Sequence, residues 1–132
     1  MHFIFDLIRK IMRGKLYGEP VMLWGDGYQK RELVYVDDFV RIMLQLVGKC
    51  ENHLINIGAG AEFTIRHFAQ LICEKVEYDF TKIQFDTSQY TGAISKCLNI
   101  NKLRQFYSDF ELTPITYGLQ RTIDWFIEKR IV

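Results

Sequence analysis

The sequence predicts a mixed α/β or α+β fold in which helices pack on short strands. Several segments carry apolar residues at helical spacing, and the short apolar runs between them end in glycine-rich turns. The 132 residues are enough for one domain that buries roughly two thirds of the surface of the unfolded chain. Because no repeat, low-complexity tract or linker interrupts the pattern, we expect residues 1–132 to form a single domain.

The first element is predicted to be an amphipathic helix that ends near Gly14. Its apolar residues recur at spacings of three and four, and they are Ile4, Leu7, Ile8, Ile11 and Met12. Such spacing gathers them on one helix face, so the helix should pack against an apolar surface. Asp6, Arg9 and Lys10 interrupt the stretch. Its apolar length is therefore far below the roughly 20 residues that cross a bilayer, and it has no cleavage-site pattern.

Residues 21–39, VMLWGDGYQKRELVYVDDF, combine a strand, a glycine turn, an arginine and a helix start. Residues 21–24 form an apolar run that enters the turn, and residues 33–36 are predicted to be the strand that leaves it. Asp37 or Asp38 stands where a helix N-cap belongs. A helix should follow, because the next apolar residues recur at helical spacing: Phe39, Val40, Met43, Leu44 and Val47.

The remainder of the chain alternates in the same way. Residues 53–57 predict a strand that runs into Gly58-Ala59-Gly60, and Thr64 is expected to cap a helix. That helix carries Ile65, Phe68, Ala69, Ile72, Cys73 and Val76 on one face, so Cys73 should be buried. The predicted order then continues with a strand over residues 82–86, a polar loop through Ser95, a helix over residues 100–107, and a helix from Thr113-Pro114 to about residue 130.

Composition narrows the classes of partner. The chain is 48% hydrophobic and 25% charged, and its formal net charge is +1. Such a balance gives no electrostatic reason to bind nucleic acid or an anionic membrane. Cys50, Cys73 and Cys97 are odd in number and show no CxxC spacing, so neither a disulfide framework nor a metal site is indicated. We therefore expect a cytoplasmic protein with reduced thiols.

Residues 21–39 resemble the substrate-side motif of the extended short-chain dehydrogenase/reductases, the NAD-dependent epimerase/dehydratase family. The tryptophan before the glycine turn and the Arg-Glu pair after it favour the GDP-L-fucose synthase subgroup. The resemblance runs from about His2 to Trp125 and covers only the C-terminal part of a much longer family pattern. It implies a small substrate-binding lobe that lacks the Rossmann cofactor half, with residues 53–58 adding a strand to the parallel sheet of that half.

The resemblance implies roles for four residues. Arg31 would contact the diphosphate of a nucleotide sugar, which suits a planar guanidinium that binds phosphate oxygens in pairs. Trp24 would lie near the sugar and Lys96 near the nucleotide, and His2 would be the acid of epimerisation. The structural alternatives are a solvated or carboxylate-paired Arg31, a Trp24 packed in the core and a solvated loop lysine at Lys96.

Residues 89–95 depart from the family pattern. After Phe-Asp-Thr-Ser the family commonly has Lys-Pro-Asp-Gly-Thr-Pro-Arg-Lys, whereas this chain has Gln-Tyr-Thr-Gly-Ala-Ile-Ser-Lys, so only Gly92 and Lys96 are retained. The context of His2 differs as well, because Met1 and Phe5 replace a serine and a proline. These differences leave the identity of the nucleotide sugar open.

Three motifs imitate the missing cofactor half. Gly58-Ala59-Gly60 precedes a helix, but Phe63 stands where a dinucleotide loop needs its third glycine, and the turn at residues 25–27 fails similarly. Tyr78 and Lys82 have YxxxK spacing, yet the family's pair needs a continuous helix and lies upstream of the substrate motif. The sequence thus predicts no cofactor site in this chain, while the resemblance implies NADP(H) for the complete enzyme.

Two functions of different classes follow. The first is the nucleotide-sugar-binding portion, GDP-linked by resemblance, of an NAD(P)-dependent sugar epimerase/reductase that is not catalytically competent alone. The second is a non-catalytic binding or assembly module that uses the same lobe as a dimer interface. A remnant without function is a third possibility. A detached lobe would expose an apolar face, so we expect either a homodimer or a separate chain that carries the Rossmann half.

Overall fold

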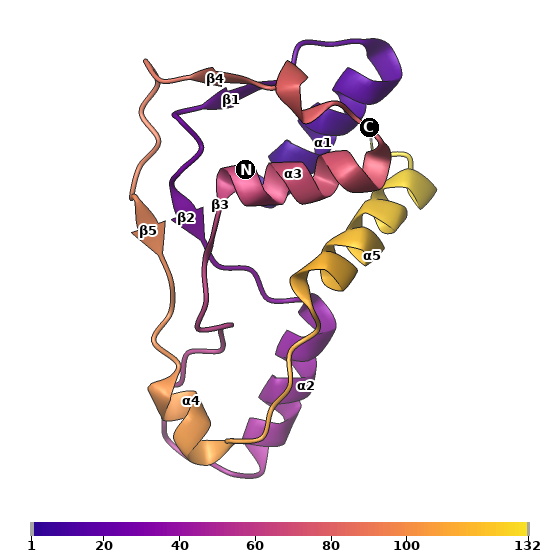
Figure 1. The fold of residues 1–132 in the computed structure, drawn as a ribbon. Helices are drawn as coiled ribbons and strands as arrows, with labels where there is room; N and C mark the ends of the chain where they lie inside the picture. The colour runs from indigo at the N-terminus through magenta and orange to yellow at the C-terminus, as the bar shows by residue number, and fades with distance from the viewer. Residues whose placement is uncertain (1, 132) are drawn as a thin grey trace.

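The computed structural model describes residues 2–131 and confirms a mixed fold of helices and short strands (Figure 1). In chain order the elements are α1 (Phe3–Tyr17), β1 (Met22–Trp24), β2 (Lys30–Arg31), α2 (Val36–Val47), β3 (Phe63–Thr64), α3 (Ile65–Val76), the short 3-10 helix η1 (Phe80–Lys82), β4 (Gln84–Asp86), β5 (Ser95–Lys96), α4 (Asn101–Phe106) and α5 (Ile115–Glu128). None of the helices within this described range is long and apolar enough to cross a membrane.

Two hydrophobic clusters lie at opposite ends of the molecule. The larger one joins α1, β1, α3 and α5, and its fully buried side chains include Ile8, Ile72 and Phe126. The smaller one joins α2 and the region of α4, and its buried members are Ile42, Leu46, Ile100 and Leu103. Figure 1 shows α1 and α3 at one end, α2 and α4 at the other, and extended segments running between them.

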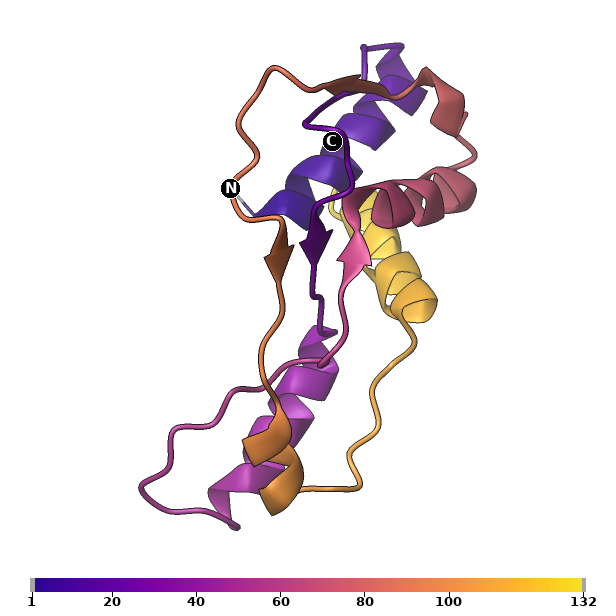
Figure 2. The same ribbon diagram turned by 60° about the vertical axis from the view of Figure 1, so that its left-hand side comes forward.

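The strands form two small sheets. β1 pairs in parallel with β4, so that Leu23 lies opposite Phe85. β2 lies between β3, which is antiparallel to it, and β5, which is parallel to it (Figure 2). Because β1 and β2 belong to different sheets, the glycine turn between them connects two sheets and is not a hairpin. The strand expected over residues 33–36 is wrong, since the second strand is Lys30–Arg31 and α2 begins at Val36.

The strand expected over residues 53–57 is also absent from the described structure. Across residues 2–131, no backbone-to-backbone hydrogen bond involves residues 51–62, and Leu54 is 89% exposed. Side chains hold the segment instead. The Asn56 amide donates to the Asn99 carbonyl, and the Glu32 carboxylate accepts from the N–H groups of Ala59 and Gly60. A strand requires a hydrogen-bonded neighbour, and this segment has none in the described chain.

The helices follow their apolar patterns closely. Thr64 caps α3 as expected, because its hydroxyl accepts from the N–H of His67 at 3.1 Å. Cys73 is buried at 2% exposure, and burial raises the pKa of its thiol to about 11. α1 continues past Gly14 to Tyr17. Gly14 serves packing there, since a Cβ on it would lie 2.4 Å from Val21.

α2 differs most from expectation. Its N-cap is Tyr35, without a side-chain hydrogen bond, so neither expected aspartate caps it. The face that it buries consists of Asp38, Ile42 and Leu46. The opposite side carries exposed apolar side chains, each at least 41% accessible: Val36, Phe39, Val40, Met43, Leu44 and Val47. α2 therefore has one apolar face in its own core and a second one in solvent.

Candidate functional site

A cleft of about 400 Å³ lies where α1, β1 and β2 meet the loop that follows β4. We call it the Arg31 cleft, and its polar and aromatic lining includes Asp6, Lys10, Trp24, Gln29, Arg31 and Tyr90. Its volume lies within the range of small-molecule sites. Two of the sequence-predicted residues, Trp24 and Arg31, are thus brought together, although they belong to strands of different sheets.

Arg31 is held in the lining of this cleft by backbone carbonyls. Its Nη1 donates to the carbonyl of Lys30 at 2.6 Å and to that of Ala93 at 2.9 Å, and its Nη2 reaches the carbonyl of Thr91 at 3.4 Å. No carboxylate pairs with Arg31 within residues 2–131. The guanidinium therefore keeps its charge for a ligand while it fastens the loop after β4.

Trp24 is 59% exposed, so core packing does not account for its position. Its carbonyl accepts from the side-chain Nε2 of Gln29 at 3.2 Å. The other end of that amide, Oε1 of Gln29, is buried and has no hydrogen-bond partner among the described residues. The Arg31 cleft thus combines an exposed indole with a neighbouring amide whose oxygen is buried and has no partner among the described residues.

Lys10 is a second cation in the cleft that sequence reasoning did not select. Its Nζ lies 3.0 Å from the Asp6 carboxylate, four residues earlier on α1, and donates to the carbonyl of Met22 at 3.2 Å. The Asp6-Lys10 spacing was visible in the sequence, but such pairs are common on solvated helix faces. Only the packing of α1 beside β1 shows that this pair lines a cleft.

Lys96 does not join this cleft. It lies opposite Arg31 in the register of β5 and β2, but it lines a different depression together with Glu32, Cys97 and Leu98. His2 does not line the Arg31 cleft either. It precedes α1 as an exposed residue, and its ring packs at 5.4 Å from the ring of Phe3, which is part of the lining.

Glu32, the residue after Arg31, ties three segments together. Its carboxylate accepts from the backbone N–H groups of Ala59, Gly60 and Leu98, the last at 2.6 Å. Partial desolvation, followed by the nearby Glu32 carboxylate, raises the pKa of the thiol of Cys97, which is an exposed residue. The two residues of the Arg-Glu pair therefore bind different segments. Arg31 holds the loop after β4, whereas Glu32 holds residues 59–60 and the segment after β5.

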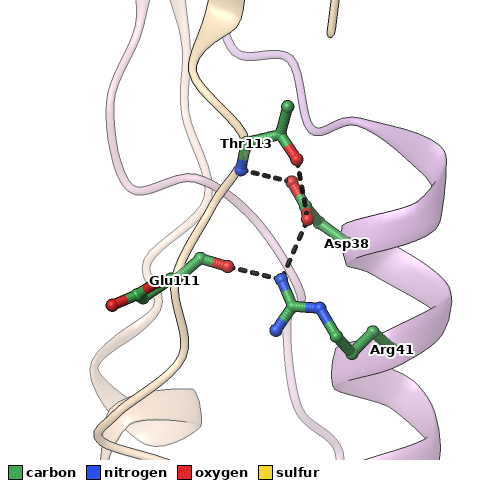
Figure 3. Close-up of polar contacts among 4 residues, drawn as sticks. All are labelled: Asp38, Arg41, Glu111 and Thr113. Atoms are coloured by element: carbon green, nitrogen blue, oxygen red, sulfur yellow. Dashed lines mark hydrogen bonds and ion pairs between the residues drawn. The ribbon is translucent and has the colours of Figure 1, made fainter.

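A second polar cluster fixes α2 to the segment that precedes α5 (Figure 3). Asp38 is 4% exposed and accepts from the Thr113 N–H at 2.7 Å, from the Thr113 hydroxyl at 3.0 Å and from Arg41 at 2.9 Å. Arg41 also donates to the carbonyl of Glu111. Burial raises the pKa of Asp38, but these hydrogen bonds outweigh it and leave the pKa below its usual value.

The motifs that imitate a cofactor site are not assembled into one. Tyr78 lies outside any helix and Lys82 ends the short helix η1, so the YxxxK pair has no continuous helix to hold it. Phe63 lies in β3, and its ring stacks on His67 at 5.1 Å. No cluster of three or more potential metal ligands occurs within the described range.

Comparisons with known proteins agree with this fold. The model of the NAD dependent epimerase/dehydratase family matches residues 1–58. GDP-L-fucose synthase 1 of Arabidopsis thaliana is 31% identical over 97% of this chain and 40% of its own length. GDP-L-fucose synthase of Escherichia coli is 31% identical over 98% of this chain and 43% of its own length. This chain belongs to the NAD-dependent epimerase/dehydratase family.

Solved structures contain the same fold. The UDP-glucose 4-epimerase of Thermotoga maritima, solved with UDP-glucose, superposes with a TM-score of 0.82 at 26% identity, over 98% of this chain and 40% of that one. A GDP-L-fucose synthetase of Naegleria fowleri bound to NADP superposes with a TM-score of 0.90 at 23% identity, over 99% of this chain and 41% of that one. The chain thus spans about two fifths of the length of these relatives.

Proposed function

We propose that this chain is the nucleotide-sugar-binding portion, corresponding to the C-terminal part, of an NAD(P)-dependent sugar epimerase/reductase. The observation that carries the proposal is the Arg31 cleft, which joins two cations, Arg31 and Lys10, with an exposed Trp24. The proposed ligand is GDP-linked, in keeping with relatives named GDP-L-fucose synthase. We treat residues 1–132 as one unit of that enzyme.

The chemistry of the cleft suits a diphosphate. Arg31 donates to neutral carbonyls of Thr91 and Ala93, and phosphate oxygens make charge-assisted hydrogen bonds that are roughly twice as strong. A diphosphate can therefore displace one carbonyl and bind the guanidinium through two N–H groups. Lys10 adds a mobile point charge, and Trp24 adds an apolar wall and one N–H donor for the sugar.

Lys96 and His2 are two further proposed site residues that lie outside the lining of the Arg31 cleft. Lys96 is the register partner of Arg31, and its long side chain can reach across the strand edge toward the nucleotide. His2 adjoins Phe3 of the cleft, and we propose it as the acid of epimerisation once the rest of the enzyme surrounds it.

We propose that NADP(H) is held by another part or another chain, so that these residues do not turn over substrate alone. Neither glycine motif suits a dinucleotide, because Phe63 occupies the position of the third glycine in one of them. Hydride transfer needs that cofactor beside the sugar. Turnover by this chain alone with NADPH and a GDP-4-keto sugar would contradict the proposal.

A cytoplasmic location fits three cysteines that form no disulfide in the described structure.

The exposed side of α2 favours a second candidate, an assembly module. Its six accessible apolar residues form a surface that monomeric proteins rarely leave uncovered. Residues 51–58 make no backbone-to-backbone hydrogen bond within residues 2–131, so their backbone can pair with a foreign strand. In the assembly module a second copy of this chain would cover both features, whereas under the leading proposal the cofactor-binding portion would cover them.

Isothermal titration calorimetry separates the two candidates. Under the leading proposal the chain binds GDP and GDP-mannose, and Arg31→Ala weakens both. Tight homodimerisation in sedimentation experiments, without any nucleotide binding, supports the assembly module and contradicts the leading proposal.

A further inference from the structure

We propose that Tyr90 is the outer aromatic wall of the Arg31 cleft and stacks on the nucleobase of the bound nucleotide. This inference rests on the proposed function and deepens it. Tyr90 stands in the loop that departs from the family pattern, so neither the resemblance nor the comparisons assign it a role.

The environment of Tyr90 is unusual for so large a ring. It lines the Arg31 cleft together with Trp24, yet it is 87% exposed. No other aromatic ring packs against it and no hydrogen bond reaches its hydroxyl in the part of the chain that the structure describes. The ring therefore contributes little to the stability of the fold, and both of its faces are accessible to a ligand.

The loop that carries Tyr90 is nevertheless fastened on both sides of it. Before the ring, Asp86 accepts from the backbone N–H and the hydroxyl of Ser88. After the ring, Arg31 binds the carbonyls of Thr91 and Ala93, and Lys30 donates its N–H to Ile94 at 2.7 Å. Because anchors flank Tyr90 closely, the backbone that carries the ring is held in place before any ligand arrives, which lowers the entropic cost of binding.

A second contact keeps the loop close to the glycine turn. Gly25 has φ +81°, and a Cβ on it would lie 2.4 Å from the methyl group of Thr91. The N–H of Gly25 also donates to the carbonyl of Asp86 at 2.7 Å. The turn that follows Trp24 and the loop that carries Tyr90 thus pack directly on each other, which keeps both aromatic residues on one cleft.

The chemistry of the lining assigns the nucleobase to this ring. Phosphates belong at Arg31, whose charge is unpaired among the described residues. Sugar hydroxyls need several polar partners, and Asp6 and the indole N–H of Trp24 supply these in the same lining. Tyr90 offers a flat π face with one hydroxyl, which matches a base and not a polyol. Since every base has such a face, the gain should be similar for guanine and uracil.

The test compares nucleotides with pyrophosphate, which has no base. Calorimetric titrations would use GDP, UDP and inorganic pyrophosphate against the wild-type chain, Tyr90→Ala and Tyr90→Phe. Tyr117→Ala is the matched control, because Tyr117 is also exposed but lies on α5 outside the cleft. Circular dichroism would verify that each variant is folded.

We expect Tyr90→Ala to lower the affinity for GDP and UDP about tenfold and to change the affinity for pyrophosphate by less than about twofold. Tyr90→Phe and Tyr117→Ala should resemble the wild type. Unchanged GDP affinity in Tyr90→Ala, or an equal loss for pyrophosphate, overturns the role of Tyr90 alone while Arg31-dependent GDP binding still stands. A wild-type chain that binds neither GDP nor pyrophosphate overturns the proposed function and this inference with it.

Discussion

Asp38 and Thr113 lie 75 positions apart in the sequence, yet the Asp38 carboxylate accepts both the N–H and the hydroxyl of Thr113, at 2.7 and 3.0 Å (Figure 3). These bonds fix the first turn of α2 to the segment that leads into α5. Since α2 follows directly after β2 and its Arg31, the contact also helps to set the end of the strand that carries the candidate site.

We expect Asp38→Asn to lower the free energy of unfolding by about 2 kcal/mol. The substitution removes a buried charge that three donors share, and it turns an amide donor toward at least one of them. Urea denaturation measures the change. Asp37→Asn is the control, because Asp37 is exposed and should shift stability by less than about 0.5 kcal/mol. Equal effects in the two variants would contradict this account of Asp38.

The pH dependence of stability should carry the signature of Asp38. Its pKa in the folded protein lies below that of the unfolded chain, which is near 3.8. The ionised carboxylate therefore contributes its full stabilisation to the folded state above that value. This stabilisation is lost as the pH falls through the lower pKa of the folded protein. The stability difference between wild type and Asp38→Asn should be constant from about pH 7 to 5 and should shrink below about pH 4. Urea midpoints at these pH values measure it, and a difference that varies mainly above pH 5 speaks against Asp38.

Replacing Arg31 should make the loop after β4 more mobile and should also weaken ligand binding. Arg31→Ala removes the donors to Thr91 and Ala93, so amide hydrogen exchange over residues 88–95 should accelerate. GDP affinity should fall by at least about tenfold, since charge-assisted bonds to phosphate contribute roughly 1.5–3 kcal/mol. Arg31→Lys separates the two effects. It keeps the charge but cannot hold two carbonyls at once in the same planar geometry.

For Arg31→Lys we therefore expect intermediate affinity together with fast exchange in the loop. Exchange that is as slow as in the wild type for both variants would show that other contacts hold the loop. Exchange over α3 serves as the internal reference, because that helix makes no contact with the Arg31 side chain in the described hydrogen bonds.

The exposed side of α2 should govern association and leave the fold unaffected. Val40→Glu combined with Met43→Lys places charges on two residues that are 42% and 41% exposed. We expect the unfolding free energy to change by less than about 1 kcal/mol, while any self-association or capture of a cofactor-binding chain is lost. Sedimentation velocity and urea denaturation measure the two quantities.

Leu46→Ala is the contrasting variant on the same helix. Leu46 is buried at 6% exposure in the smaller cluster, so its truncation should cost about 2–5 kcal/mol of stability. If the double charge variant destabilised the protein as much as Leu46→Ala does, the exposed side of α2 would belong to the core and not to an interface.

Much of the fold could be predicted because it depends on local sequence. The apolar periods of α1, α3 and α5 set which face each helix buries, and Thr64 caps α3 through a contact only three residues away. The strand at residues 53–57 failed for the opposite reason. A strand exists only with a neighbour, and nothing in its own five residues reveals whether that neighbour is present.

For the candidate site as well, local sequence predicts some features and only the tertiary structure decides the others. Sequence alone determined the family motif around Trp24 and Arg31 and the core position of Cys73, because these depend on residue type and short spacing. The tertiary structure alone decided that Lys10 and Tyr90 share a cleft with Arg31, and that Lys96 lies elsewhere. Tyr90 is 59 positions beyond Arg31, and only backbone carbonyls around it connect the two. Every residue has a backbone carbonyl, so no side-chain pattern in the sequence could predict that contact.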